Sequence, residues 1–305
     1  MKRVFSILAF LLCVLVVNAQ TDNIVRKQSQ KRPTTQTTTA AKKQTTTTKP
    51  AKKTSATKPA NKTSATTSST NSNRQRILQE LADNMVYVQG GTFTMGATSV
   101  QGSEAYDDEK PAHSVTLSSY YIGKTEVTQE LWEAVMGSNP SKFKGNRKPV
   151  EQVSWNDCQT FISKLNSLTG KNYRLPTEAE WEFAARGGIK SKGYKYSGSN
   201  TLGDVAWYRD NSVNTTLDVG TKNPNELGLY DMSGNVWEWC NDRYGYDYYG
   251  SSPSNNPTGP SSGLRRVIRG GCWGGFASFC RSLRRNNDLP DFCYDNLGLR
   301  LCLSE

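Results

Sequence analysis

Residues 228–242, GLYDMSGNVWEWCND, place several oxygen ligands around a tight turn. Asp231 precedes a Gly-Asn turn and Glu238 follows it. The backbone carbonyls of Gly234 and Val236 lie between the two carboxylates in the sequence. Ca²⁺ takes about six to eight oxygen ligands, and both carboxylate and carbonyl oxygens serve. The segment therefore suits a calcium site, and a tight turn with ordinary caps is the alternative.

Residues 269–285, RGGCWGGFASFCRSLRR, hold two cysteines, Cys272 and Cys280, among glycines, aromatic residues and arginines. A pair of thiols can support chemistry, because thiolates act as nucleophiles and bind soft ions such as Cu(I). The same pair can form a disulfide that only stabilises the fold. The residue types alone favour the disulfide.

Aromatic and basic side chains surround these cysteines. Arginine forks bind carboxylates and sulfates, and aromatic rings pack against peptides. The segment therefore predicts a groove for an acidic or peptide ligand, and salt bridges within the domain are the alternative for its arginines. The predicted groove residues are Trp273, Phe276, Arg281 and Arg284.

Several enzyme classes are excluded by what the chain lacks. His113 is its one histidine, which rules out a HExxH zinc site and any multi-histidine metal cluster within one chain. The paired glycines are followed by no Lys-Ser or Lys-Thr, so no phosphate-binding loop of that type is present. Conventional metallohydrolase and nucleotide chemistry is therefore not expected.

The chain begins with the pattern of a signal peptide. Two basic residues precede an apolar run at 4–17, and Val17 and Ala19 are the small residues that signal peptidase requires. We therefore expect removal of residues 1–19 and a periplasmic or secreted mature protein. Six cysteines then remain in an oxidising space, which permits three disulfides of undetermined pairing. They are Cys158, Cys240, Cys272, Cys280, Cys293 and Cys302.

The net charge of +11 comes from the N-terminal part of the chain. Residues 1–76 contain 15 Lys and Arg and one acidic residue, so 23 basic and 26 acidic residues remain in 77–305. Residues 20–75 are rich in Thr, Lys, Ala and Ser and nearly devoid of apolar side chains, which predicts a disordered linker. We expect this linker to act as a spacer or to contact an anionic surface polymer. Nucleic acid is not an expected partner of an exported protein.

Capping signals predict three helices in the rest of the chain. Thr128 precedes the first, and Ser154 precedes a second that should end at Gly170. Thr177 precedes the third, and Glu180 three residues later completes a capping box.

Residues 76–305 are expected to form one domain. A short helix at 76–84 leads into MVYVQGGTFTMGA at 85–97, where apolar and polar residues alternate on both sides of a glycine pair, which predicts a hairpin. Between 188 and 263, Gly, Asn, Pro and Ser recur so often that long loops must predominate. The predicted class is α+β with little regular structure.

Seven motifs, in one order along residues 85–303, closely resemble those of the formylglycine-generating enzymes, also called sulfatase-modifying factors. The resemblance implies a variant of the C-type-lectin-like fold, and it implies calcium ligands at Asp231, Gly234, Val236 and Glu238. It also implies an activity, the oxidation of a cysteine in an unfolded sulfatase to formylglycine with copper and O₂. The motifs are MVYVQGGTFTMGA, YYIGKTEVTQELWEAVMG, PVEQVSWNDC, YRLPTEAEWEFAARGG, NELGLYDMSGNVWEW, RVIRGG and DNLGLR.

The active cysteine pair of that family is broken in this chain. On the family motif, Cys280 falls on the second active cysteine and Gly275 on the first, whereas Cys272 takes a position that is serine in the active enzymes. A glycine has no side chain to bind copper, which puts copper chemistry in doubt. Two functions remain. One is an oxidase in which Cys280 is the thiolate and Cys272 its displaced partner, and the other is a non-catalytic module that binds a protein or glycan of the cell envelope.

Overall fold

The computed structural model describes residues 63–99 and 104–304. The described residues belong to one compact unit. The expected signal peptide at 1–19 and most of the expected linker lie outside the described residues. None of the described helices combines the length and apolar character needed to cross a lipid bilayer.

The first described element is a long helix, α2 (Thr63–Asp83), which begins well before Arg76. Its C-terminal part is fixed by buried Ile77 and Leu78, which pack in the same core cluster as α3. A helix already nucleated by packing extends at low cost into polar sequence. The prediction of disorder up to residue 75 is therefore wrong for residues 63–75, where the chain is helical.

The strands form three small sheets. Their orders are β1-β4-β10-β5, β2-β3 and β8-β7-β6-β9, and all pairs are antiparallel except β6 with β9. The bounds are β1 Met85–Val88, β2 Gly91–Met95, β3 His113–Leu117, β4 Tyr120–Gly123, β5 Tyr173–Arg174, β6 Trp237–Arg243, β7 Arg266–Arg269, β8 Arg285–Asp288, β9 Leu297–Leu299 and β10 Cys302–Ser304.

The predicted hairpin at 85–97 is wrong, because its two strands join different sheets. β1 pairs with β4, and β2 pairs with β3. Gly90, between them, lies against the next chain segment, where a Cβ would be 2.4 Å from the carbonyl oxygen of Leu117. The glycine therefore permits a close backbone approach and does not form a hairpin turn.

The capped helices are confirmed. Thr128, Ser154 and Thr177 each accept a hydrogen bond from the third residue of the helix that follows, and Gly170 ends its helix at φ 66°. These helices are α3 (Gln129–Met136), α4 (Trp155–Thr169) and α5 (Glu178–Ala185). The shorter elements are η2 (Asp107–Glu109), η3 (Gly188–Lys190), α6 (Leu202–Val205), η4 (Tyr248–Gly250) and η5 (Ala277–Cys280).

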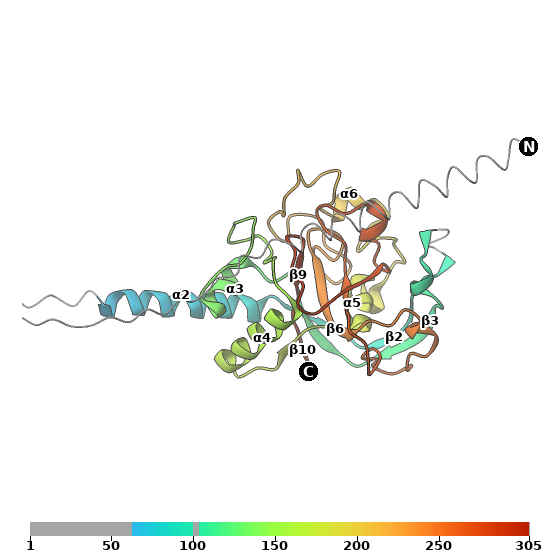
Figure 1. Cartoon of the computed structure of the whole chain (residues 1–305), viewed down its shortest axis with the longest axis horizontal. Coiled ribbons are helices and arrows are strands. Elements are labelled where there is room, and N and C mark those ends of the chain that lie inside the picture. Colours follow the sequence, from blue (N-terminus) through green and yellow to red (C-terminus); the bar gives the residue numbers. More distant parts are fainter. Residues whose placement is uncertain (1–62, 100–103, 305) are drawn as a thin grey trace, which may run out of the picture. The chain divides into compact units, whose positions relative to one another are not determined.

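Three of the helices gather on one side of the domain, whereas α5 packs among the strands of the β2-β3 and β8-β7-β6-β9 sheets. In Figure 1, α2, α3 and α4 lie together at one end of the domain, while β2 and β3 lie at the other. Trp132 of α3 stacks on Phe161 of α4 with ring centroids 4.8 Å apart. Between α6 and β6 no helix or strand occurs, so irregular loops carry the residues that reach the candidate site. The predicted loop-rich α+β fold is confirmed.

Candidate functional site

The two cysteines of the 269–285 segment lie close together in the interior. Cys272 follows β7, and Cys280 ends η5. Gly271, at φ 79°, lets these segments meet, because a Cβ there would be 2.8 Å from the Cys280 sulfur. The Cys280 thiol donates to the Phe276 carbonyl at 3.8 Å, and the Asn296 side chain donates to the Cys272 sulfur at 3.4 Å.

Both thiols are held in the protonated form. Cys280 is fully buried and Cys272 is 3% exposed. Burial raises the pKa of Cys280 well above its usual value, and the charge of a neighbouring Cys272 thiolate would raise it further. Burial also raises the pKa of Cys272 to about 11. At neutral pH neither sulfur is therefore a nucleophile or a ready metal ligand.

Position 275 faces the Cys272 thiol. A Cβ on Gly275 would lie 3.5 Å from the Cys272 sulfur and 3.2 Å from its carbonyl oxygen. A cysteine there would complete a thiol cluster, but glycine supplies no sulfur. The residues present do not fit the two-thiolate copper site that the resemblance implies, because one ligand position is empty and the remaining thiols are buried and protonated.

The predicted disulfides are not seen, since all six described cysteines are free thiols. Cys158, Cys240 and Cys302 are fully buried on α4, β6 and β10. Cys293 is exposed. In this structure the buried cysteines therefore stabilise the core by packing and not by disulfide bonds.

The arginines assigned to the groove are committed to ion pairs. Arg281 is fully buried, and its two terminal nitrogens bind Glu109 at 2.8 and 2.7 Å. Arg284 lies 3.5 Å from Asp108, and its side chain is 15% exposed. The prediction that Arg281 lines the groove is wrong. A buried guanidinium needs a carboxylate partner, and Glu109 of η2 supplies it.

The aromatic half of the groove does reach the surface. Phe276 is 56% exposed. The Arg209 guanidinium lies 4.6 Å from its ring centroid. The edge of Phe143 meets the Trp273 ring at 5.3 Å. Val213 is 80% exposed and sits at φ 50°, a conformation that β-branched residues rarely adopt.

These residues belong to one surface. The Arg209 N–H donates to the Gly275 carbonyl at 3.1 Å, and the Ser212 hydroxyl donates to the Trp273 carbonyl at 2.8 Å. The loop at 209–213 therefore runs beside residues 273–276. We call this surface the Phe276 patch; it comprises Phe143, Arg209, Val213, Trp273 and Phe276.

The residues predicted to bind calcium surround a buried cluster of charge. Glu238 is fully buried and binds Arg300 through both oxygens at 2.7 to 3.1 Å. Asp231 accepts the Gly220 N–H at 2.7 Å through one oxygen, while its other oxygen has no hydrogen-bond partner in the described structure. Asp231 and Glu238 therefore differ, because only Asp231 keeps an oxygen free.

Sequence reasoning missed a third carboxylate, Glu126. It is 2% exposed and accepts hydrogen bonds from the Val236 N–H at 3.0 Å and the Asn235 side chain at 2.7 Å. Burial raises the pKa of Glu126 well above its usual value, and the charges of Asp231 and Glu238 raise it further. No local signal marks Glu126, because its partners lie about 110 residues away.

The cluster holds more negative than positive charge. Burial raises the pKa of Asp231 to about 6, which the Gly220 N–H and the Arg300 charge partly oppose. The Arg300 guanidinium lowers the pKa of Glu126 and so partly offsets these negative charges. This excess, together with the free Asp231 oxygen, fits a cation. Among the described residues no three His, Cys, Asp or Glu side chains are arranged to bind a metal, so backbone carbonyls would have to complete the site.

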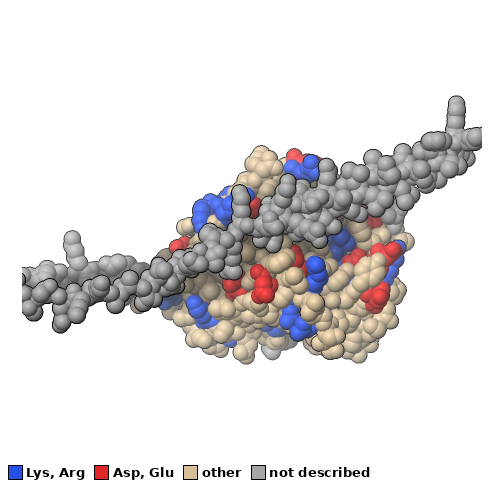
Figure 2. All heavy atoms as spheres, viewed as in Figure 1, with Lys and Arg blue, Asp and Glu red and all other residues tan. Residues whose placement is uncertain are grey.

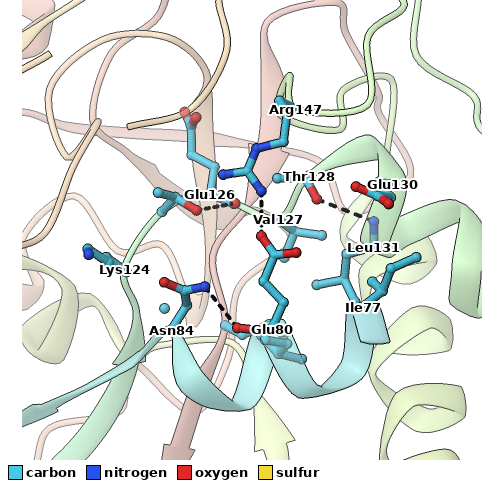
Figure 3. Close-up of a pocket in the computed structure, with 14 residues that line it drawn as sticks. Ile77, Glu80, Asn84, Lys124, Glu126, Val127, Thr128, Glu130, Leu131 and Arg147 are labelled. Carbon is cyan, nitrogen blue, oxygen red and sulfur yellow. Dashed lines mark hydrogen bonds and ion pairs between the residues drawn. The ribbon is translucent and has the colours of Figure 1, made fainter. Parts of the chain in front are cut away.

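A small cavity of about 70 Å³ opens beside this cluster, between the end of α2 and the chain before α3 (Figure 3). Glu80 and Arg147 form an ion pair at 2.5 Å across it. The Glu126 carboxylate instead binds the 235–236 turn. Glu80 and Arg147 pair with each other and are therefore not available to a ligand. This makes the cavity a weaker candidate binding site than the Phe276 patch.

Comparison with known proteins identifies the family. The model of the "Sulfatase-modifying factor enzyme 1-like domain" matches residues 69–304. The chain belongs to the sulfatase-modifying factor family. A formylglycine-generating enzyme of Streptomyces coelicolor is 32% identical over 70% of this chain and 87% of that enzyme. The family assignment and the fold implied by the motifs are therefore confirmed.

Relatives of this sulfatase-modifying factor domain carry other names as well. "Chaperone protein LppX" of Paenibacillus barcinonensis is 37% identical over 63% of this chain and 79% of that protein. Among solved structures, Treponema denticola variable protein 1 superposes with a TM-score of 0.67 and 36% identity, covering 72% of this chain and 95% of that one. Family membership therefore establishes the domain and leaves its activity to be argued from the site.

Proposed function

We propose that this domain is a non-catalytic sulfatase-modifying factor that binds an extended segment of a cell-envelope protein at the Phe276 patch. The observation that carries the proposal is the broken thiol pair. Gly275 supplies no sulfur, and burial holds Cys272 and Cys280 protonated. Without two accessible thiolates the family's copper-dependent oxidation has no ligand set, so binding is the role that the remaining surface supports best.

The Phe276 patch has the properties of a peptide-binding surface. Exposed apolar side chains, Phe276 and Val213, lie beside a guanidinium that can pair with a carboxylate. Burial of one such aromatic ring contributes about 1.5–3 kcal/mol to binding. The strained conformation of Val213 is consistent with a functional loop. The Paenibacillus relative is named a chaperone, which agrees with binding of unfolded protein.

The second candidate is an oxidase that uses a displaced pair. Cys272 follows Gly271, where a Cβ would lie 2.8 Å from the Cys280 sulfur, so the two cysteines are neighbours. Opening of this segment would have to expose both and lower their pKa values before they could bind copper. The substrate in this case is an unfolded sulfatase, as in the enzymes that the chain resembles.

One experiment separates the two functions. A labelled cysteine peptide with the sulfatase recognition pattern is mixed with the purified protein, copper and air, and both its anisotropy and its mass are recorded. We expect binding without aldehyde formation. Phe276→Ser should weaken binding about tenfold or more, since about 1.4 kcal/mol corresponds to a factor of ten.

The control variants test whether binding depends on the Phe276 patch or on the cysteines. Leu168→Ser removes an exposed apolar residue from α4, 45% exposed, and should leave binding unchanged. Cys280→Ser should also bind normally. A formylglycine-generating enzyme with the usual cysteine pair verifies the assay. Aldehyde formed by the wild type and lost in Cys280→Ser would reject the binding proposal in favour of the oxidase.

We also propose that the carboxylate cluster binds calcium through Asp231, Gly234, Val236 and Glu238. Ca²⁺ would supply a fixed positive charge that offsets the buried carboxylates, and it has no part in a reaction step. Millimolar Ca²⁺ should raise the melting temperature at pH 7.5, and chelation should reverse the change.

Asp231→Asn should abolish the calcium effect, because asparagine keeps the shape and tolerates the φ of 58° at this position. The exposed Asp210→Asn is the matched control. A calcium-dependent rise that survives in Asp231→Asn would contradict the assigned ligand set.

Export of the protein remains a proposal that rests on the leader at 1–19. The basic residues of 20–62 would then lie outside the cytoplasm, where they could contact an anionic surface polymer. A glycan of the envelope is the alternative ligand for the Phe276 patch, and competition of soluble envelope glycans against the labelled peptide would reveal it.

A further inference from the structure

Two arginines, Arg243 and Arg266, lie opposite each other at the end of the β6–β7 pair, away from the Phe276 patch and the carboxylate cluster. Arg243 and Arg266 are direct cross-strand partners in the antiparallel β6–β7 pair, next to a shift in register between Trp239 and Arg243. Like charges directly opposite each other destabilise a sheet. Arg265, the adjacent residue, is 52% exposed.

The guanidinium groups of Arg243 and Arg266 each donate one hydrogen bond to a backbone carbonyl, and their other N–H groups make no hydrogen bond in the described structure. Arg266 lies over the Trp155 ring, 3.8 Å from its centroid, and one of its nitrogens donates to the Asn241 carbonyl at 2.7 Å. One nitrogen of Arg243 donates to the Gly263 carbonyl. These contacts fix the forks in position, and they use neutral partners, so the positive charges are not neutralised.

The nearby carboxylates are engaged elsewhere. Asp242 is 2% exposed and accepts the Glu178 N–H at 3.0 Å, and burial raises its pKa well above the usual value. Asp288 is the Cα partner of Arg266 across β7–β8, but its ion pair is with Arg265, at 3.8 Å.

The arginine cluster contrasts with the rest of the domain. Residues 77–305 contain more acidic than basic residues, 26 against 23. On the face shown in Figure 2, positive and negative side chains are mixed over the described surface. Burial and the nearby Arg243 charge lower the pKa of Arg266, and the charge of Asp242 opposes them only in part.

We propose that Arg243 and Arg266 form a binding site for a tetrahedral oxyanion, such as a sulfate or phosphate ester. Two fixed guanidinium forks offer several charge-assisted donors to such a group. A divalent oxyanion would remove the repulsion across the β6–β7 pair. The site is separate from the Phe276 patch, so the proposal stands whether or not that patch binds protein.

The test is arginine modification mapped by mass spectrometry on the full mature chain. The protein is treated with an arginine-selective dicarbonyl in sodium sulfate, sodium phosphate or sodium chloride at equal ionic strength. Site-by-site mapping separates the cluster from the basic N-terminal region. When the oxyanion concentration is roughly ten times its Kd, the modification of Arg243 and Arg266 should be about tenfold slower than in chloride. Arg147, which is 52% exposed and pairs with Glu80, serves as the internal reference.

Each outcome bears on the proposal. Selective protection by sulfate or by phosphate supports the proposal. The anion that protects more strongly indicates whether the ligand is a sulfate or a phosphate ester. Equal modification in all three salts, or equal protection of Arg147, overturns the proposal. Arg243→Gln should remove the protection of Arg266, whereas Lys164→Gln, an equal loss of charge on exposed α4, should preserve it. Full protection of Arg266 in Arg243→Gln would also overturn the paired site.

Discussion

Replacement of Arg300 by methionine is expected to lower the free energy of unfolding by about 3–5 kcal/mol at neutral pH, because it leaves buried carboxylates without their cation. Arg300 is fully buried, binds Glu238, and donates to the carbonyls of Gly123 and Tyr230 at 2.9 and 2.8 Å. Urea denaturation followed by tryptophan fluorescence measures the loss. Arg147→Met, which removes a 52% exposed arginine from a surface ion pair, should cost less than about 1 kcal/mol.

The loss should depend on pH in a defined direction. The pKa values of Glu126 and Asp231 are raised in the folded state, the latter to about 6. Stability from such groups is present below their unfolded pKa values and is lost as pH rises through the folded values. The cost of Arg300→Met should therefore shrink between pH 7.5 and pH 5. If Arg300→Met lowers the free energy of unfolding equally at pH 7.5 and pH 5, Arg300 stabilises the fold by packing and not by its charge.

Replacement of Gly234 by alanine is the second substitution with a large expected effect, about 3 kcal/mol or more. Gly234 has φ 88°, and a Cβ there would lie 2.3 Å from the carbonyl oxygen of Trp207. Backbone atoms of the buried 207 segment cannot move aside as a flexible side chain can. The change therefore combines an unfavourable conformation with a steric clash.

Gly228→Ala separates these two causes. Gly228 has φ 81°, but a Cβ there would meet nothing within 4 Å. It should cost only the conformational penalty, about 1–2 kcal/mol. Chemical denaturation of both variants under the same conditions gives the comparison. Equal costs would show that the 234 turn relaxes and that the close approach to Trp207 is not a structural requirement.

The sequence was informative where the determining contacts are local. The caps at Ser154 and Thr177 are formed by residues three positions apart, so both helix starts were predicted correctly. The motif order likewise identified the family, and with it the loop-rich α+β fold. The pairing of β1 with β4 was not predictable in this way, because the partner strand lies more than thirty residues further along the chain.

The candidate site was harder to predict because its partners are remote. Arg281 was placed in a groove since its neighbours in sequence are aromatic, but its counter-ion is Glu109, 172 residues away. Glu126 was overlooked for the same reason. The broken thiol pair, by contrast, was visible in the sequence, because Gly275 and Cys280 belong to one motif.

The position of β10 has a consequence for when this domain can fold. Cys302–Ser304 lies between β4 and β5 in the interior of a sheet, although it is far from both strands in the sequence. The β1–β4 pair therefore keeps one edge unpaired until residues 302–304 have been synthesised. Such pairings between distant segments slow folding, because the long intervening loop must be closed first. The nascent domain consequently remains incomplete until its last described strand has emerged, and during this interval a chaperone would meet it unfolded.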